Sequence, residues 1–261
     1  MNASSSPPLP LTDAQVASFQ RNGYLRIEAL TDNAEVEAMV GLYDELFSRD
    51  GRFAPGDRIE LNSAVASAPL PQIVNPERYA PQLVQGRAWS NAREIARQLL
   101  GDDCVPTGNH AILKPARIGG ATPWHQDEAY WDPRYAHRAV SIWLALQPAT
   151  LENGCMRFIA GSHGGPVLPH ELISPDSHGL RSGAAAPDAP ETTCELPAAG
   201  ATIHDGRTLH CAGPNLSGSP RRALVFGFGL APVLLDTPNC YPWQRPEWYD
   251  THAATRSTWT R

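Results

Sequence analysis

The sequence predicts a mainly β fold, a sandwich or barrel of short strands with helices packed on one side. Helical patterns are confined to the first 100 or so residues, and short segments typical of strands follow from Cys104 onward. The 25 prolines among 261 residues are roughly double the average usage of about 5%, which favours turns and strand edges over long helices. A chain of this length forms one sizeable core, and we expect a single domain over residues 12–261.

The N-terminal stretch contains a tail and two short elements. Residues 1–11 are rich in Ser and Pro and are expected to be disordered. Thr12 and Gln15 then form a capping-box pattern, which opens a short helix that runs to about Arg21. Residues 24–27 alternate between apolar and polar side chains, as a strand does.

Two longer helices are predicted before the strands begin. Asp32 and Glu35 mark the start of the first, whose apolar side chains recur at helical spacing and form one buried stripe: Val36, Met39, Val40, Tyr43, Leu46 and Phe47. The second is expected from about Ala88 to Leu100, with these residues facing the core: Ala92, Ile95, Ala96 and Leu99.

The rest of the chain is dominated by strands and one long loop. Expected strands are rich in β-branched and aromatic residues and bounded by Gly or Pro: 109–113, 139–146, 155–159, 201–204 and 222–228. Residues 164–195 have almost no periodicity and read as an excursion over the mouth of the barrel. A surface insertion without a role is the alternative for this loop.

Charge and cysteine content narrow the function classes. The net charge of -6 leaves no basic footprint for nucleic acid and no polybasic patch for an anionic membrane. No signal peptide and no apolar run of about 18 residues is evident. The cysteines are odd in number and contain no CxxC pair, which predicts a reducing, cytoplasmic setting: Cys104, Cys155, Cys194, Cys211 and Cys240. The oligomeric state stays open.

Three side chains form a candidate metal site. Residues i and i+2 of an extended strand project from the same face, so His125 and Asp127 can converge on one point. His210, from a distant strand, would complete a set of two imidazoles and one carboxylate, which is diagnostic of non-haem Fe(II) oxygenases. A His-x-Asp tripeptide is weak evidence by itself, because a strand-end histidine can simply hydrogen-bond its neighbour.

Arg221 lies 11 residues after His210 and strengthens the metal hypothesis. The intervening residues 212–220 read as a turn, so a hairpin can return Arg221 to the barrel interior near His210. A buried arginine needs an anionic partner, and a dicarboxylate co-substrate matches its guanidinium fork. The alternative is a solvated hairpin charge, which we accept for Arg222.

Together these motifs resemble the phytanoyl-CoA dioxygenase family of Fe(II)- and 2-oxoglutarate-dependent oxygenases. Further parts of the chain fit in the same order, from the opening Leu11-Thr12-Asp13-Ala14-Gln15 to about Pro232. They include three short stretches: Glu152-Asn153-Gly154-Cys155-Met156, Ile159-Ala160-Gly161-Ser162-His163 and Ala201-Thr202-Ile203-His204-Asp205-Gly206. The resemblance implies a double-stranded β-helix core, that is, a jelly-roll or cupin-like fold with helices on its outer face.

The resemblance also implies roles for individual residues. Fe(II) would be held by His125, Asp127 and His210, and the far carboxylate of 2-oxoglutarate would meet Arg221. Two residues would line the co-substrate pocket by family position, Trp143 and Gln72. The alternative for the tryptophan is simple core packing, and for the glutamine a turn amide.

The sequence departs from the family pattern in one place. Many members have Gly-Ser after the distal histidine, whereas this chain has Cys211 and Ala212, so a serine hydroxyl for 2-oxoglutarate is missing. Three other histidines have no spacing that favours metal binding and are interpreted as structural or pocket-wall residues: His110, His163 and His204.

The implied reaction is hydroxylation of a small natural-product or lipid-like molecule, with release of succinate and CO₂. Tyr130 and Trp131 follow the metal motif and are expected to contact this substrate, or else to pack at the rim. Asp127 argues against halogenation, because halogenases of the family replace that carboxylate. Desaturation, epoxidation or rearrangement would use the same iron site. A non-catalytic jelly-roll binding protein and a hydrolytic zinc enzyme are the rivals from other classes.

Overall fold

The structure is a computed structural model that describes residues 10–48, 53–62, 68–174, 177–183 and 190–244. The described part contains three α-helices: α1 Asp13–Asn22, α2 Asn33–Ser48 and α3 Arg87–Leu100. Each lies within about two residues of its predicted place. Among the described helices none is both long and apolar enough to cross a membrane.

The predicted helix starts are confirmed by their hydrogen bonds. The Thr12 hydroxyl accepts the Gln15 N–H, and the Gln15 side chain accepts the Thr12 N–H at 2.8 Å. Asp32 Oδ1 accepts the Glu35 N–H at 2.9 Å, at the start of α2. Most of the predicted tail, residues 1–9, lies outside the described residues. Leu11, the last residue of the predicted tail, is buried, and its N–H donates to the Gln98 side chain at 2.7 Å. Leu11 therefore already packs against the rest of the domain.

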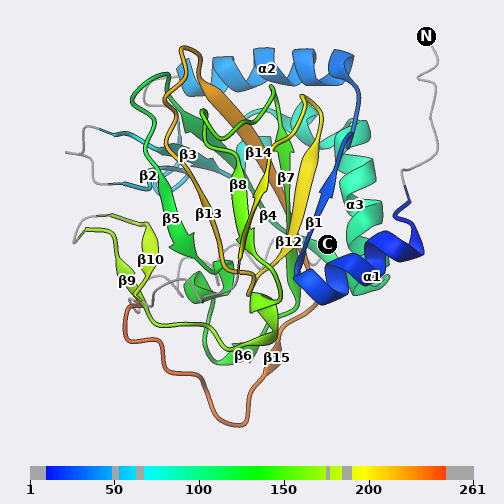
Figure 1. Cartoon of the computed structure of the whole chain (residues 1–261), viewed down its shortest axis with the longest axis vertical. Helices are drawn as coiled ribbons and strands as arrows, with labels where there is room; N and C mark the ends of the chain where they lie inside the picture. The colour runs from blue at the N-terminus through cyan, green and yellow to red at the C-terminus, as the bar shows by residue number, and fades with distance from the viewer. Residues whose placement is uncertain (1–9, 49–52, 63–67, 175–176, 184–189, 245–261) are drawn as a thin grey trace.

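Two antiparallel sheets form the core of the fold, as the mainly β prediction requires (Figure 1). The large sheet has seven strands in the order β1 (Tyr24–Ile27), β12 (Ala201–Asp205), β7 (Ala139–Ala145), β14 (Arg221–Gly229), β4 (Val105–Lys114), β3 (Pro71–Val74) and β2 (Arg58–Glu60). The small sheet has four, in the order β11 (Glu191–Cys194), β8 (Met156–Ile159), β13 (His210–Ala212) and β5 (Thr122–His125).

Short elements complete the described chain. Two two-stranded sheets are formed by β9 (His170–Leu172) with β10 (Leu180–Ser182), and by β6 (Tyr135–Ala136) with β15 (Val233–Leu234). Single 3₁₀ turns follow several strands: η1 Pro76–Arg78, η2 Pro81–Val84, η3 Asp127–Tyr130 and η4 Ser162–Gly164.

The two faces of the large sheet bury different cores. Its outer face packs against the helices, which lie along the top and right of Figure 1, and α3 contributes Trp89 against Phe226 and Phe228 of β14. Its inner face meets the small sheet, and Trp143 and Phe158 belong to that inner core. Because neighbouring side chains of a strand point to opposite faces, β14 supplies both cores in alternation. The predicted placement of helices on one side is confirmed.

Two connections differ from the prediction. Residues 212–220 do not form a hairpin, since β13 belongs to the small sheet and β14 to the large one. The segment therefore crosses between the sheets, which still carries Arg221 into the interior. The excursion 164–195 is also more regular than expected: it contains the β9–β10 hairpin, and Glu191–Cys194 pairs with β8 as a sheet strand.

Candidate active site

The three predicted metal ligands come together at one end of the inner core. His125 is the last residue of β5, Gln126 is extended with φ -120° and ψ 133°, and Asp127 opens the turn η3. Asp127 thus lies on a turn and not on a strand, but the extended Gln126 keeps both side chains on one side. His210 begins β13 and lies directly opposite His125 in the antiparallel pair.

The ligand atoms of these residues face one another. Asp127 Oδ1 lies 3.6 Å from Nε2 of His125 and 3.6 Å from Nε2 of His210. One donor atom from each residue can be chosen so that all lie within 4.8 Å of one another. Nδ1 of His125 is 2.8 Å from the Pro123 carbonyl oxygen, and Nδ1 of His210 is 2.8 Å from that of Thr208. Carbonyls only accept, so each Nδ1 carries the proton and each Nε2 presents its lone pair to the centre.

The protonation states match those of a metal site. Burial lowers the pKa of both His125 and His210, so their imidazoles are neutral at neutral pH. Burial by itself raises the pKa of Asp127, but His210 and His204 outweigh it, and the pKa lies below its usual value. Two neutral imidazoles and a carboxylate are the states in which these side chains bind a divalent cation, and the set fits Fe(II).

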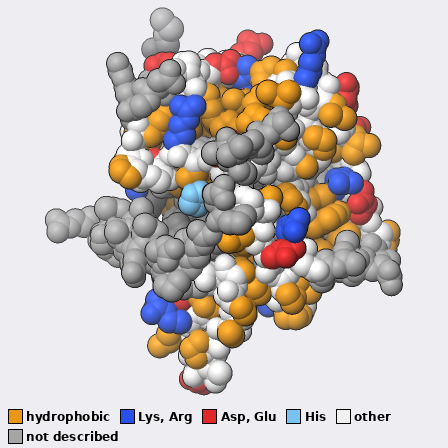
Figure 2. Space-filling model, turned by 90° about the vertical axis from the view of Figure 1, so that its left-hand side faces the viewer, with side chains coloured by type: hydrophobic (Ala, Val, Ile, Leu, Met, Phe, Trp, Pro, Cys, Tyr) orange, Lys and Arg blue, Asp and Glu red, His pale blue; other side chains and the backbone are white. Residues whose placement is uncertain are grey.

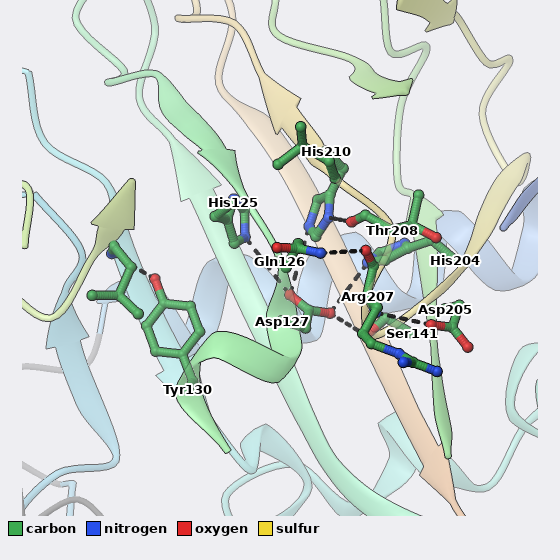
Figure 3. A network of polar contacts seen from close by, with 12 residues as sticks. His125, Gln126, Asp127, Tyr130, Ser141, His204, Asp205, Arg207, Thr208 and His210 are labelled. Atoms are coloured by element: carbon green, nitrogen blue, oxygen red, sulfur yellow. Dashed lines mark hydrogen bonds and ion pairs between the residues drawn. The ribbon is translucent and has the colours of Figure 1, made fainter. Parts of the chain in front are cut away.

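Two further residues contact Asp127 that the sequence analysis did not assign to the site. The Ser141 hydroxyl donates to Asp127 Oδ2 at 2.8 Å, and Nε2 of His204 is 3.2 Å from the same oxygen (Figure 3). The sequence predicts a structural or pocket-wall role for His204, and no motif marks Ser141. Both strands were predicted, but their pairing was not, and only that pairing places the two side chains together.

Arg221 lies in the same inner core, at the start of β14. Only 1% of the residue is exposed, and Lys114 of β4 lies directly opposite. Within the described part of the chain its Nε and Nη1 have no hydrogen-bond partner, and its guanidinium carbon lies 5.2 Å from the centre of the Trp143 ring. Burial lowers the pKa of Arg221 to about 10, which leaves the group charged at neutral pH. This buried cation requires an anion, and a carboxylate fits its geometry.

The neighbouring cations are already satisfied. Lys114 is fully buried, but its ammonium donates to backbone carbonyls, among them that of Gly213 at 2.8 Å. Arg222 points to the opposite side of β14 and pairs with Asp44, whose Oδ2 accepts at 2.8 Å. The expectation of a solvated hairpin charge is wrong for Arg222, because its side chain is only 18% exposed and forms an ion pair with α2. Arg221 therefore differs from both of its neighbours.

The two predicted pocket residues, Trp143 and Gln72, both lie on the inner face of the large sheet. Trp143 is 3% exposed and lies beneath the guanidinium. Gln72 is buried in β3 opposite Ile112 of β4, and its amide contacts a ring nitrogen of His110. Gln72 is thus a strand residue of the large sheet, and no strand was predicted from the sequence at this position.

Residues around the metal motif also form hydrogen bonds with the excursion, the segment 164–195. The Tyr130 hydroxyl accepts the Leu180 N–H at 2.6 Å, and its ring lies edge-on to His125 at 6.2 Å. The Gln126 side chain accepts the Leu168 N–H at 2.7 Å, and its backbone N–H donates to Nε2 of His170 at 3.1 Å. The excursion is therefore bonded directly to the segment that carries the ligands.

Trp131 has a packing role that is visible in the structure. Its ring lies over Gly206, where an added Cβ would come within 2.4 Å of the ring. A glycine is therefore needed between Asp205 and Arg207 to admit the indole. Whether Tyr130 and Trp131 also contact a substrate stays a prediction.

Comparison with known proteins agrees with this geometry. The sequence profile described as phytanoyl-CoA dioxygenase (PhyH) matches residues 19–223. The chain is similar to EvdO2 from Micromonospora carbonacea var. aurantiaca, solved as a complex with 2-oxoglutarate, at 38% identity and a TM-score of 0.80; the match covers 92% of this chain and 99% of that one.

Two curated relatives are more distant. A probable alpha-ketoglutarate-dependent hypophosphite dioxygenase from Stutzerimonas stutzeri is 28% identical over 62% of this chain and 58% of its own length. Phytanoyl-CoA dioxygenase domain-containing protein 1 from Bos taurus is 25% identical over 91% of this chain and 96% of its own length. The chain belongs to the phytanoyl-CoA dioxygenase family of Fe(II)- and 2-oxoglutarate-dependent oxygenases.

Proposed function

We propose that this oxygenase hydroxylates a small natural-product or lipid-like molecule, with Fe(II) held by His125, Asp127 and His210 and 2-oxoglutarate reaching from the metal to Arg221. The observation that carries the proposal is that Nε and Nη1 of Arg221 have no hydrogen-bond partner among the described residues, although they are buried in the same inner core as the three ligands. The bound 2-oxoglutarate of EvdO2, at 38% identity, supports the choice of anion.

Each residue of the site has a stated task in this proposal. Iron, when bound, would couple the decarboxylation of 2-oxoglutarate to succinate and CO₂ with the activation of O₂. Nε2 of both histidines and one Asp127 oxygen would occupy one face of the metal and leave the opposite face open. Arg221 would orient the far carboxylate, while Trp143 and Gln72 would line the co-substrate pocket and exclude water.

The substrate is proposed to enter beside Tyr130 and Trp131, under the excursion. The hydrogen bonds that Gln126 and Tyr130 accept from Leu168 and Leu180 support a position of the excursion beside the site. On the face shown in Figure 2, the Lys and Arg side chains of the described residues stand apart from one another, several beside Asp or Glu.

The proposal further includes a single domain over residues 12–261 and a biosynthetic role in a reducing, cytoplasmic setting. The free state of all five cysteines supports the reducing environment. Hydroxylation is proposed as the default outcome, and desaturation, epoxidation or rearrangement would use the same iron site.

Succinate release tests the proposal. Metal-free protein supplied with Fe(II), 2-oxoglutarate and air should release succinate slowly without substrate and faster with a correct one. Asp127→Ala should release none, whereas Arg222→Ala should behave as wild type. Folded, iron-loaded wild-type protein that releases no succinate with any compound would favour the non-catalytic binding protein instead.

A further inference from the structure

The two oxygens of the Asp127 carboxylate have different surroundings. Oδ1 faces Nε2 of both candidate histidine ligands at 3.6 Å. Oδ2 receives the Ser141 hydroxyl at 2.8 Å and Nε2 of His204 at 3.2 Å. One oxygen is therefore directed to the metal position and the other to the protein (Figure 3).

The two donors to Oδ2 come from the large sheet, across the inner core from β5. Ser141 of β7 and His204 of β12 are directly paired in the antiparallel ladder, so their side chains share the inner face. They are buried or half-buried, and backbone pairing fixes their separation. The pair thus anchors the turn that follows β5 to a rigid part of the opposite sheet.

The His204 ring packs against two other aromatic rings, and within the described residues its Nδ1 has no hydrogen-bond partner. Its ring lies 4.3 Å from that of His210 and 5.6 Å from that of Phe158, centre to centre. A carboxylate only accepts, so Nε2 of His204 carries the proton in this contact. The packed ring can therefore offer its N–H to Oδ2 without losing further side-chain freedom.

We propose that Ser141 and His204 are positioning residues that restrict Asp127 to one metal–oxygen bond, an inference that rests on the metal centre proposed above. A carboxylate bound through both oxygens would take a fourth coordination position and leave two of six. The co-substrate, which would chelate the metal, and O₂ would then share the positions that Asp127 leaves open. Occupying Oδ2 with two donors keeps a third position available. Protein groups of this kind typically change metal affinity 10–100-fold when they are removed.

Paired variants test the proposal on the metal-free full chain titrated with Co(II), whose visible absorption reports both affinity and coordination. Ser141→Ala and His204→Phe each remove one donor, and the phenyl ring keeps the aromatic packing. We expect each to weaken Co(II) binding about 10-fold or more and to alter the spectrum. Ser141→Thr and His204→Gln restore a donor at the same place and should recover most of the affinity.

A matched control and a folding check make the outcome decisive. Thr202→Val changes a buried side chain on the same strand, two residues from His204 and without a contact to Asp127, and should bind Co(II) as wild type does. Thermal melts without metal identify variants that do not fold; the two donor-removing changes lie on different strands, so the one that folds still decides if the other does not. Wild-type affinity and spectrum in each donor-removing variant that folds would overturn the positioning role. Failure of the wild type itself to bind Co(II) would instead overturn the metal centre.

Discussion

The inner core has two ends that differ in how their polar groups are satisfied. At the metal end, formed by His125, Asp127 and His210, the atom of each ligand that faces away from the centre has a hydrogen bond. At the arginine end, formed by Arg221 and Trp143, two guanidinium nitrogens have no hydrogen-bond partner in the described chain. The protein itself supplies the hydrogen bonds that orient the side chains at the metal end, whereas the guanidinium at the arginine end requires a ligand as its partner.

The two ends therefore differ in how much of the ligand-binding geometry the protein fixes before a ligand binds. Hydrogen bonds that fix ligand orientation prepare the metal end before the metal arrives. A buried charge without a partner costs several kcal/mol even after relaxation. Arg221 carries that cost in the absence of ligand, and an arriving carboxylate would relieve it. The contrast predicts that changes at the two ends have separable effects.

The largest effect is expected at the metal end. Asp127→Ala removes the carboxylate that faces both imidazoles, so Co(II) or Fe(II) binding and all 2-oxoglutarate turnover should be lost. Calorimetric titration of the metal-free protein measures the first, and succinate release the second. Metal affinity close to wild type in this variant would remove Asp127 from the ligand set.

At the arginine end, Arg221→Ala should weaken 2-oxoglutarate binding by about 2–5 kcal/mol, the range for truncating one partner of a buried charge pair. Metal affinity should not change, because Arg221 does not contact the ligands. Arg222→Ala is the matched control, since that neighbouring arginine pairs with Asp44 on the other side of β14. Equal losses in the two variants would show that the effect is a general loss of positive charge.

A stability measurement sharpens the same contrast. Replacing an unpaired buried cation by an apolar side chain of similar volume removes a desolvation cost, so Arg221→Met should stabilise the ligand-free protein by about 1–4 kcal/mol. The same variant should no longer bind 2-oxoglutarate. Denaturant unfolding of the metal-free protein measures the stability. A destabilised variant would mean that Arg221 already has a partner in the free protein.

The smallest effect concerns pH at the metal end. Burial lowers the pKa of His125 and His210 below the usual 6.5, so at that pH these imidazoles are protonated less than free imidazoles and protons compete less with the metal. Metal affinity should therefore fall less between pH 8 and pH 6.5 than it would for two ordinary histidines. Two exposed histidines would lose about fourfold at pH 6.5. A loss of that size would place the imidazoles in a more solvated site.

The sequence was informative where structure is local. The capping pattern of Thr12 with Gln15 and the apolar stripe of α2 located helices to within about two residues, because caps and periodicity depend on neighbouring residues. The spacing of His125 and Asp127 predicted their convergence, and the 11-residue interval from His210 pointed to Arg221. The structure brings the three ligand candidates together and buries the arginine in the same core.

Long-range pairing accounts for what the sequence did not reveal. Ser141 and His204 meet only because β7 pairs with β12 in one register, and a shift of β12 by one residue would turn His204 to the helical face. The crossing of residues 212–220 between sheets depends on which sheet takes β13, and no local pattern records that choice. Gln72 lies on the inner face because β3 pairs with β4, and the sequence of this short strand shows no clear alternation of apolar and polar residues that would predict it.

The most direct test of the two-ended site is an anaerobic titration of Fe(II) and 2-oxoglutarate into metal-free protein, followed by the visible absorption band of the chelate. The wild type should develop the band, Asp127→Ala should develop none, and Arg221→Ala should develop it only at much higher 2-oxoglutarate concentration. If Arg221→Ala develops the band at the wild-type concentration, Arg221 does not bind 2-oxoglutarate and the account is contradicted. If the folded wild type never develops the band, the metal site itself is contradicted.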